Sequence, residues 1–418
     1  MQLKKPAGAA TSALMAASCA LLASSPGRAQ EASGDEWLVD SAVLYYKEDQ
    51  SRVQAIEPVV SLTRDFGEDR VLGAKITFDS LSGGSPNGAL PGRSPQTFAT
   101  PSGMKLYTVA PGKLPLDPNF HDQRIALNGQ WQQRLGTDMR ISVGGDISHE
   151  EDFMSAGING TLARDFNNKN TTLSFGANYE ADSIRPIGGV PVGGTDYTQP
   201  DKGGSESKTV GGLLLGMTQV MSRRWLAQLN YSYDRSQGYQ NDPYKILSVI
   251  DASGNTAGYR FENRPDSRAR QSLFLENKVA VGADVLELSL RYMKDDWGIH
   301  SRTADLRYRW QLGSGMYLEP HARYYNQSAA NFYDVFLRQD ATPVDFMSAD
   351  PRLGSFDAMT YGVKFGAIMA DHSELSVRLE QYKQTPQNLP AAFGQLQGLD
   401  LAPGLKAVML QVAWRFSF

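Results

Sequence analysis

The sequence has 418 residues, of which 41% are hydrophobic, and its mean hydropathy is -0.38. A helical membrane protein of this size would need several apolar runs of about 18 residues or more, and the sequence contains no such run. The chain is nevertheless rich in Gly (40), Tyr (18) and Phe (17). This composition suits many short strands with dispersed hydrophobicity.

The first 29 residues predict a secretory signal peptide. Lys4 and Lys5 form a positive segment, residues 9–23 are apolar or small, and Gly27-Arg28-Ala29 places small residues at both positions of a cleavage site. We expect cleavage after Ala29. A short membrane anchor is the alternative interpretation.

Removal of this segment leaves 389 residues with 38 Lys and Arg against 45 Asp and Glu, a net charge of -7. Cys19, the one cysteine, leaves with it. A lipid anchor at Cys19 is disfavoured because Ala16 replaces the large aliphatic residue usual three positions earlier. Without cysteine the remaining chain forms no disulfide, thiolate metal site, iron–sulfur cluster or thioether-linked haem. Its acidic balance argues against nucleic acid as a partner.

From residue 30 onwards, apolar and polar residues alternate in successive segments, which predicts strands with two unlike faces. In the last segment Val408, Leu410 and Val412 share one face, and Met409 and Gln411 share the other. We place sixteen strands, at residues 37–48, 52–65, 70–82, 121–135, 138–149, 153–165, 171–183, 206–221, 224–237, 268–281, 284–295, 299–312, 316–326, 356–370, 374–384 and 405–418.

Short and long connections alternate between these strands. Tight turns such as Gly136-Thr137-Asp138 lie on one side, whereas the other side carries the long segments 83–120, 184–205, 239–267, 327–354 and 385–403. Short periplasmic turns opposite long extracellular loops are typical of outer-membrane barrels, and an even strand count returns both ends to the periplasm. The first two strands and the segment 245–262, alternatively an extracellular hairpin, leave the count open.

The predicted fold class is therefore all-β: a transmembrane antiparallel up-and-down β-barrel of about 16 strands (14–18). It occupies residues 30–418 as one domain behind the signal peptide 1–29. The predicted location is the outer membrane of a Gram-negative bacterium, with membrane lipids as one partner.

The C-terminal residues predict an assembly signal. Trp414, Phe416 and Phe418 lie at alternate positions, and the last of them ends the chain. A terminal aromatic residue preceded by alternating apolar residues resembles the signal recognised by the barrel-assembly machinery, which we predict as a second partner. The same residues fit an aromatic girdle at the lipid boundary.

Charged residues alternate with the apolar ones along the predicted strands and are expected to face the lumen. They either set the selectivity of a channel or pair across strands and fill the interior. The predicted pore-lining residues are Lys75, Asp79, Arg140, Glu287, Arg291, Asp305, Arg307, Arg309, Arg378 and Arg415.

Two outer turns carry residues that suit a metal ion. His149 and Glu151 lie in one turn, and Asp295, Asp296 and His300 lie in another. Carboxylate oxygens are favoured by hard cations, so both turns are candidate metal sites. Solvated polar turns are the alternative, because neighbouring residues on a strand point to opposite faces.

Catalytic signals are lacking in the sequence. None of the five histidines stands beside a nucleophile motif, and no Gly-x-Ser-x-Gly string occurs. We therefore predict no enzymatic activity, no catalytic or cofactor-binding residues and no cofactor bound by the chain itself.

The longest loop, residues 83–120, combines Gly and Pro with many apolar residues. Phe98, Leu106, Tyr107 and Val109 are unusual in a solvated loop. We expect this loop to fold inward and constrict the pore.

Several long strings of the sequence resemble the domain of unknown function 3570 family of predicted outer-membrane barrels. The resemblance covers nearly all of the chain after the signal peptide. One departure is Asn331, where the family is expected to have Asp, which puts a cation-ligand role there in doubt. The strings begin at Asp40 (DSAVLYYKE), Arg52 (RVQAIEP), Asp79 (DSLSGGSPNGA), Gln96 (QTF), Pro101 (PSG), Asn241 (NDPYK), Glu262 (ENRPDSR), Asp295 (DDW) and Tyr325 (YNQSAANFY).

This resemblance implies neighbours rather than a biochemical activity. Members of the family tend to accompany a small flavinylated periplasmic lipoprotein, a flavin transferase and a thioredoxin-like protein. The resemblance thus implies a barrel that serves as a sheath or scaffold for an extracytosolic flavin-based electron-transfer lipoprotein. The alternative is a passive porin or substrate-specific channel for small solutes.

Overall fold

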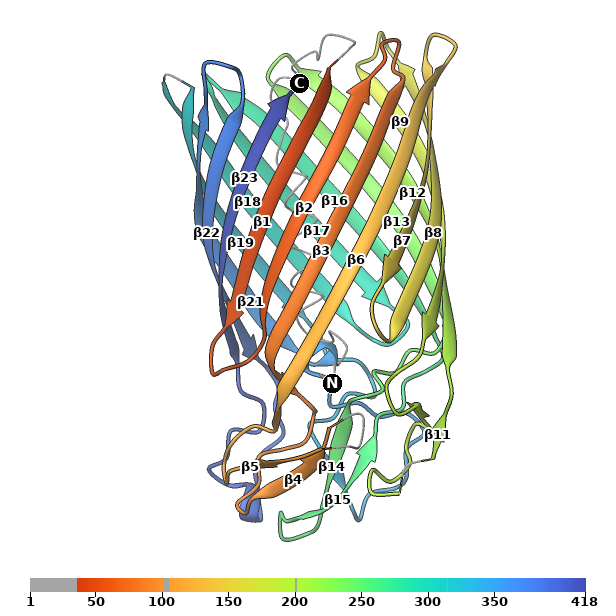
Figure 1. The fold of residues 1–418 in the computed structure, drawn as a ribbon, viewed down its shortest axis with the longest axis vertical. Coiled ribbons are helices and arrows are strands. Elements are labelled where there is room, and N and C mark those ends of the chain that lie inside the picture. Colours follow the sequence, from red (N-terminus) through yellow and green to blue (C-terminus); the bar gives the residue numbers. More distant parts are fainter. Residues whose placement is uncertain (1–35, 101–104, 200, 314) are drawn as a thin grey trace.

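A computed structural model describes residues 36–100, 105–199, 201–313 and 315–418. Sixteen antiparallel strands form a closed barrel, in agreement with the predicted fold class (Figure 1). In order around the wall they are β1 Trp37–Glu48, β2 Gln54–Asp65, β3 Val71–Pro86, β6 Leu116–Leu135, β7 Met139–His149, β8 Phe153–Phe166, β9 Thr171–Ile184, β12 Glu206–Ser222, β13 Trp225–Gly238, β16 Ser267–Val281, β17 Asp284–Asp295, β18 His300–Gly313, β19 Met316–Gln327, β21 Phe356–Ile368, β22 Glu374–Pro386 and β23 Leu405–Ser417.

The barrel closes where its first strand pairs with its last. Along this seam Val43 lies opposite Val412, and the backbones of Trp37 and Phe418 exchange two hydrogen bonds of 2.8 and 3.0 Å. Closure pairs every strand of the described wall on both sides, which a structure surrounded by lipid requires.

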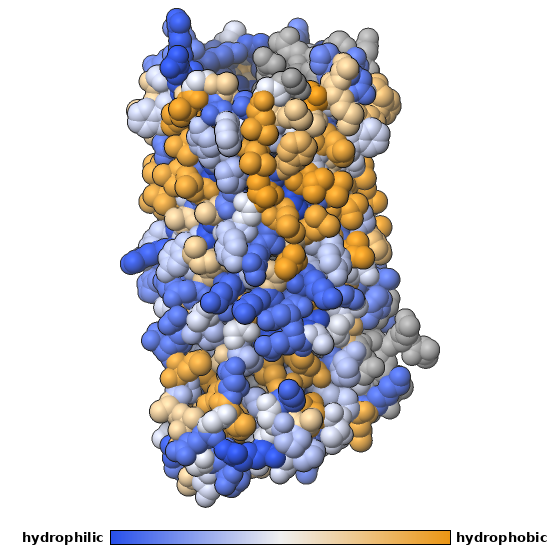
Figure 2. Space-filling model, turned by 90° about the vertical axis from the view of Figure 1, so that its left-hand side faces the viewer, coloured by the Kyte–Doolittle hydropathy of each residue, from blue (hydrophilic) through white to orange (hydrophobic). Residues whose placement is uncertain are grey.

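The outer face of the wall is apolar. On β23, Val408, Leu410, Val412 and Trp414 are each between 40% and 47% exposed, whereas the alternate residue Ala407 is buried. In Figure 2 apolar side chains gather in the upper half of the visible face, below a polar rim and above a broad polar band. Large exposed apolar side chains all around a closed barrel are the mark of a lipid-facing surface. The architecture is that of an outer-membrane β-barrel.

No helix among the described residues is long and apolar enough to span a membrane. The predicted signal peptide, residues 1–29, lies outside the described residues.

Short turns join the strands at one end of the barrel, at the top of Figure 1. Several need backbone conformations that favour glycine or asparagine: Gly136 has φ +70°, and Asn167 and Asn168 have φ 51° and 54°. The predicted tight turn Gly136-Thr137-Asp138 lies at this end, between β6 and β7.

The long connections gather at the opposite end and fold against one another, at the bottom of Figure 1. We call residues 87–115, 185–205, 239–266, 328–355 and 387–404 together the cap. Its small elements are β4 Gln96–Ala99, β5 Leu106–Val109, β10 Val190–Pro191, β11 Lys202–Gly203, β14 Ile246–Ile250, β15 Thr256–Phe261, β20 Leu337–Arg338 and the 3-10 turns η1 Pro351–Leu353 and η2 Gly394–Leu396. The strands β14 and β15 form the hairpin considered for residues 245–262.

The cap crosses the mouth of the barrel. The N–H of Ile246 donates to the carbonyl of Asn87 at 2.8 Å. Asn87 lies in the loop that joins β3 to β6, and Ile246 in the loop that joins β13 to β16. Between these two pairs of strands the wall has four further strands in one direction and eight in the other. The N–H of Gln395 donates to the carbonyl of Ser253 at 2.9 Å, which ties a third loop to the same hairpin. Contacts between loops from distant parts of the wall hold the cap over the opening.

Apolar residues within the cap form its own cores. Ala89, Phe98, Val109, Ile246 and Phe261 make one cluster, although they come from two loops. A second cluster contains Leu90, Ile250, Val335, Leu396 and Leu401, drawn from four connections. Packing against another loop thus accounts for Phe98, Tyr107 and Val109 of loop 83–120, whereas Leu106 is 73% exposed.

Candidate functional site

All ten residues predicted to line the pore lie on the inner face of the wall. Alternation establishes this on β17, where Leu288 and Leu290 are 38% and 45% exposed on the outside and Glu287 and Arg291 take the opposite face. The same argument places the other eight. Whether they line a conducting path stays a prediction.

Most of these inner charges are paired. Glu287 lies 3.4 Å from Lys278 and 3.3 Å from Arg307, and Arg307 lies 3.5 Å from Asp305. His321 continues the chain of contacts, with Nε2 at 3.1 Å from Asp305. Pairs on adjacent strands therefore follow one another around this part of the wall.

The remaining predicted inner residues also have specific contacts, with Lys75 as the exception in the described part of the chain. Arg378 lies 3.4 Å from Glu319, Arg140 lies 2.7 Å from Asp165, Arg415 lies 2.5 Å from Asp40, and Asp79 pairs with Arg124. The guanidinium of Arg309 stacks 3.6 Å from the ring centre of Tyr317. The guanidinium of Arg291 lies 5.2 Å from the ring centre of Phe274. Paired charges of this kind fill and stiffen the interior.

The two candidate metal sites are not assembled. Asp295 is occupied by Arg268, whose Nη2 lies 2.5 Å away, and by the N–H of Ile299. Asp296 accepts from the N–H of Ala269, and His300 contacts the hydroxyl of Tyr292 at 3.2 Å. No group of three or more His, Cys, Asp or Glu side chains within the described ranges could hold a metal ion, and the exposed His149 and Glu151 belong to no such group.

The proposed assembly residues form an aromatic row on the outer face of the closing strand. The ring centres of Trp414 and Phe416 are 4.4 Å apart, and those of Phe416 and Phe418 are 6.4 Å apart. Phe418 is 68% exposed beside the short turns. This position suits the lipid boundary on the side of the short turns.

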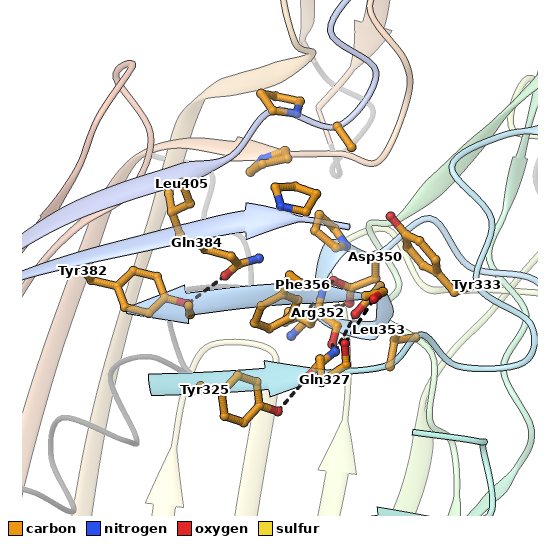
Figure 3. Close-up of a pocket in the computed structure, with 18 of the residues that line it drawn as sticks. Tyr325, Gln327, Tyr333, Asp350, Arg352, Leu353, Phe356, Tyr382, Gln384 and Leu405 are labelled. Carbon is orange, nitrogen blue, oxygen red and sulfur yellow. Dashed lines mark hydrogen bonds and ion pairs between the residues drawn. The ribbon is translucent and has the colours of Figure 1, made fainter. Parts of the chain in front are cut away.

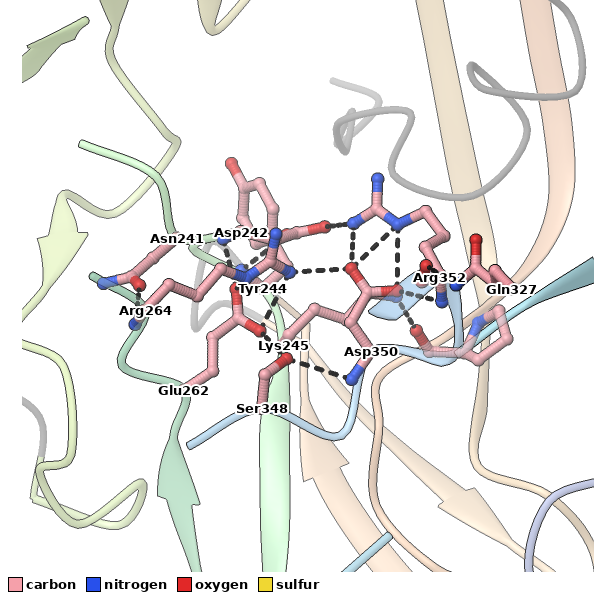
Figure 4. Close-up of polar contacts among 11 residues, drawn as sticks. Asn241, Asp242, Tyr244, Lys245, Glu262, Arg264, Gln327, Ser348, Asp350 and Arg352 are labelled. Carbon is pink, nitrogen blue, oxygen red and sulfur yellow. Dashed lines mark hydrogen bonds and ion pairs between the residues drawn. The ribbon is translucent and has the colours of Figure 1, made fainter. Parts of the chain in front are cut away.

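A cluster of buried charges holds the cap together (Figure 4). Asp350 has a fully buried carboxylate, which accepts from Nη2 of Arg264 at 2.7 Å and also pairs with Arg352. Arg264 lies 2.9 Å from Glu262, and Arg352 lies 3.1 Å from Asp242. The charges alternate in sign, so each buried ion has an opposite neighbour.

Electrostatics within this cluster follow from its burial. Burial alone would raise the pKa of Asp350, but Arg352 and Arg264 outweigh it and hold that pKa below its usual range. Burial also raises the pKa of Glu262, with Arg264 opposing the shift. The Ser348 hydroxyl donates to Glu262 at 2.6 Å. The cluster thus keeps Asp350 ionised between two arginines.

Between the cap and the barrel wall lies a cavity of about 580 Å³ (Figure 3). Its lining extends from cap residues such as Leu90 and Asp350 to wall residues such as His321 and Glu380. Volumes of this order hold small-molecule ligands in many proteins. Loop 83–120 thus covers the mouth through the residues around Gly88 to Leu90, and much of the remaining loop packs into the cap.

Comparison with known proteins decides the family. A family model described as "Protein of unknown function (DUF3570)" matches residues 11–416. The chain belongs to the DUF3570 family. No curated protein matches this member of the family.

Solved outer-membrane proteins resemble this DUF3570 protein at low identity. A mutant of the ferric enterobactin receptor of Pseudomonas aeruginosa matches with a TM-score of 0.41 and 11% identity over 84% of this chain and 53% of the receptor. The outer membrane protein opdK of the same organism matches with a TM-score of 0.40 and 10% identity, over 92% and 99% of the two chains. A bacterial polysaccharide outer membrane secretin matches with a TM-score of 0.42 and 8% identity, over 91% and 98%. The chain spans about half the length of the receptor.

The residues that the sequence did not reveal belong to the cap. Loop residues far apart in the sequence carry no periodic signal, and this holds for Asp350, Arg352, Glu262 and Arg264. Glu262 and Arg264 do occur in one of the strings shared with the DUF3570 family. Asn331 lies against the turn of Trp297, to whose carbonyl its N–H donates at 2.8 Å.

Proposed function

We propose that this DUF3570 protein is an outer-membrane sheath for a small electron-carrying lipoprotein with a covalently bound flavin. The partner is the one that the family resemblance implies. The observation that carries the proposal is the bridge between Ile246 and Asn87, which holds the cap across the outer mouth. A simple diffusion pore has no need of such a cover, whereas a sheath can be closed at the outer end and occupied from the periplasm.

The chain supplies no redox group for this role. Its one cysteine lies in the predicted signal peptide, and the sequence contains no flavin acceptor string. If electrons cross the membrane here, the partner carries them. The barrel would contribute insulation from lipid and a polar inner wall, and no catalysis of its own.

Co-purification tests the proposal. The full chain is tagged in its native host, extracted from outer membranes in mild detergent and run on a denaturing gel under ultraviolet light. We expect a small fluorescent band from a covalently flavinylated protein in stoichiometric amount. A barrel purified intact without any flavin-bearing partner would overturn the sheath.

A second function is favoured by the cavity beneath the cap. Its arginine-rich lining suits a substrate-specific channel that selects small anions before they enter the lumen. Liposome swelling with the partner-free barrel separates the two functions. A channel admits selected small anions faster than neutral solutes of equal size, whereas a capped sheath admits neither.

A further inference from the structure

The cavity beneath the cap is strongly cationic. Seven arginines line it, against three carboxylates, Glu48, Asp350 and Glu380. Four of the arginines have a carboxylate within ion-pair distance, namely Arg264, Arg268, Arg307 and Arg352. The positive charge is therefore greater than the cavity's own acids can balance.

Three arginines remain without an acidic partner. Within the described residues no carboxylate lies within 4.0 Å of the guanidinium of Arg52, Arg270 or Arg323. Arg52 is 9% exposed and has one long hydrogen bond, from Nη2 to the carbonyl of Pro403 at 3.5 Å. Arg270 and Arg323 project inward from β16 and β19. A buried or half-buried guanidinium favours an anion with which it can form charge-assisted hydrogen bonds.

The acids of the cavity are already engaged. Glu48 accepts from the Tyr46 hydroxyl at 2.8 Å and from the N–H of Val53 at 3.3 Å. Glu380 contacts His321 at 2.8 Å, and Asp350 is held by its two arginines. Among the described lining residues no free acid is left to attract a cation, so the cavity selects for negative charge.

Aromatic rings form part of the wall of the same cavity. The hydroxyl of Tyr325 donates to Gln327 at 2.7 Å, and that of Tyr382 donates to Gln384 at 2.8 Å (Figure 3). Together with Tyr46, each tyrosine is tied to a residue two positions along its own strand. These bonds satisfy the polar ends of the rings. Tyr46 is buried in a core cluster, so the faces of Tyr325 and Tyr382 form the fixed apolar surface. The ring of Phe356 packs against that of Tyr325, with 5.6 Å between the two ring centres.

We propose that this cavity binds a small aromatic anion, a carboxylate or a phosphate ester. Its acid group is held by Arg323. Its ring lies against Tyr325, two residues along β19, and Tyr382, which lies level with Arg323 two strands away on the same inner face. The cavity volume of about 580 Å³ accommodates such a ligand. The proposal goes beyond the sheath, because binding here needs neither the lipoprotein nor transport.

Binding to the purified full chain in detergent tests this. Benzoate and phenyl phosphate are titrated by calorimetry, beside acetate, benzyl alcohol and benzylamine. We expect the two aromatic anions to bind and the neutral and cationic aromatics not to bind. The anion that binds more tightly shows whether the cavity prefers a carboxylate or a phosphate ester. Equal binding of benzylamine, or no heat from either aromatic anion, would overturn the proposal.

Variants locate the site. Arg323→Gln should weaken binding about tenfold, which corresponds to about 1.4 kcal/mol. Arg302→Gln is the matched control, because Arg302 lies on the outer face of the neighbouring strand β18 and is exposed. Tyr382→Ala should lower the preference for benzoate over acetate, and Tyr382→Phe should retain it.

Folding of each variant is checked by heat-modifiable gel mobility. Arg323→Lys, which keeps the positive charge but loses the planar fork of donors, provides a second test if Arg323→Gln fails to fold. Unchanged affinity in a folded Arg323→Gln or Arg323→Lys variant would place the anion elsewhere and overturn the assignment. Failure of the sheath would leave these outcomes unchanged, since no partner is present.

Discussion

Arg264 donates to Asp350 at 2.7 Å, although the two residues are 86 positions apart in the sequence. The contact joins the loop that precedes β16 to the loop that precedes β21, and Asp350 is fully buried there. A buried ion pair gives little net stability compared with an apolar pair, but loss of one partner leaves an uncompensated charge. The cap therefore depends on this contact more than on any surface pair.

Asp350→Asn should destabilise the cap by about 3–5 kcal/mol, because Arg264 and the half-buried Arg352 lose their shared carboxylate. We expect faster proteolytic cleavage in the cap while the barrel stays folded on heat-modifiable gels. The control is Asp340→Asn, which removes the exposed pair between Arg338 and Asp340 at 3.0 Å. Equal protease resistance of the Asp350→Asn variant and the unmodified chain would contradict the role given to the cluster.

The outer turn between β7 and β8 should respond to pH. Burial raises the pKa of Glu150 from 4.5 to about 8, and Asp122 and Asp152 add to the rise. A carboxyl with a raised pKa stabilises the fold in its protonated form. That contribution is fully present below pH 4.5 and is lost as the pH rises through about 8. Glu150→Gln should flatten the fall in melting temperature between pH 5 and pH 9 (about the range where such a group titrates). An equal fall in melting temperature in the variant and the unmodified chain would count against a role of Glu150 in this pH dependence.

A methyl group at Gly88 should loosen the cap. A Cβ at this position would lie 2.4 Å from the carbonyl oxygen of Ile246, in the hairpin that closes the mouth. Gly88→Ala should therefore separate the two loops and raise single-channel conductance in planar bilayers. Gly136→Ala is the matched control, since Gly136 also has positive φ but has open space around its Cβ position. The same conductance in both variants would show that the contact does not close the mouth.

Deletion of residues 90–112 should open the mouth further. The deletion removes β4 and β5 together with Leu90, Phe98 and Val109, which are buried against other loops. Conductance should rise well above that of Gly88→Ala. Deletion of the exposed segment 341–344 should change it little. A closed barrel after deletion of 90–112 would mean that other loops seal the opening alone.

Phe418→Ser should reduce assembly into the outer membrane. Phe418 is 68% exposed at the end of the closing strand and lies outside the barrel interior. Its loss therefore affects recognition or lipid contact more than folded-state packing. Phe66→Ser, a change at another exposed aromatic beside a short turn, is the control. Equal yields of heat-modifiable barrel from both variants would argue against an assembly signal.

The wall could be predicted from the sequence almost strand for strand. The predicted ranges 37–48 and 284–295 coincide with β1 and β17. This succeeds because lipid outside and water inside impose period-two alternation on every strand. The largest misses are β3 and β6, predicted as 70–82 and 121–135. They continue to Pro86 and from Leu116, beyond the part where alternation is enforced.

The cap could not be predicted in this way. Its strands are two to six residues long, and its buried charges come from different loops. No local pattern links Asp242 to Arg352 across 110 positions. The metal sites stay a prediction made from single segments. Such a segment does not show pairing across strands, as that of Asp295 with Arg268.

The bridge between Ile246 and Asn87 also has a consequence for the order of folding. Its two loops leave the wall at separate places, so they meet only after the strands between them have been laid side by side. Such non-local contacts form late, because the chain must first lose the entropy of every intervening connection. Formation of the cap should therefore be the last event of maturation. An antibody that binds only the assembled cap would then report when the barrel is complete in living cells.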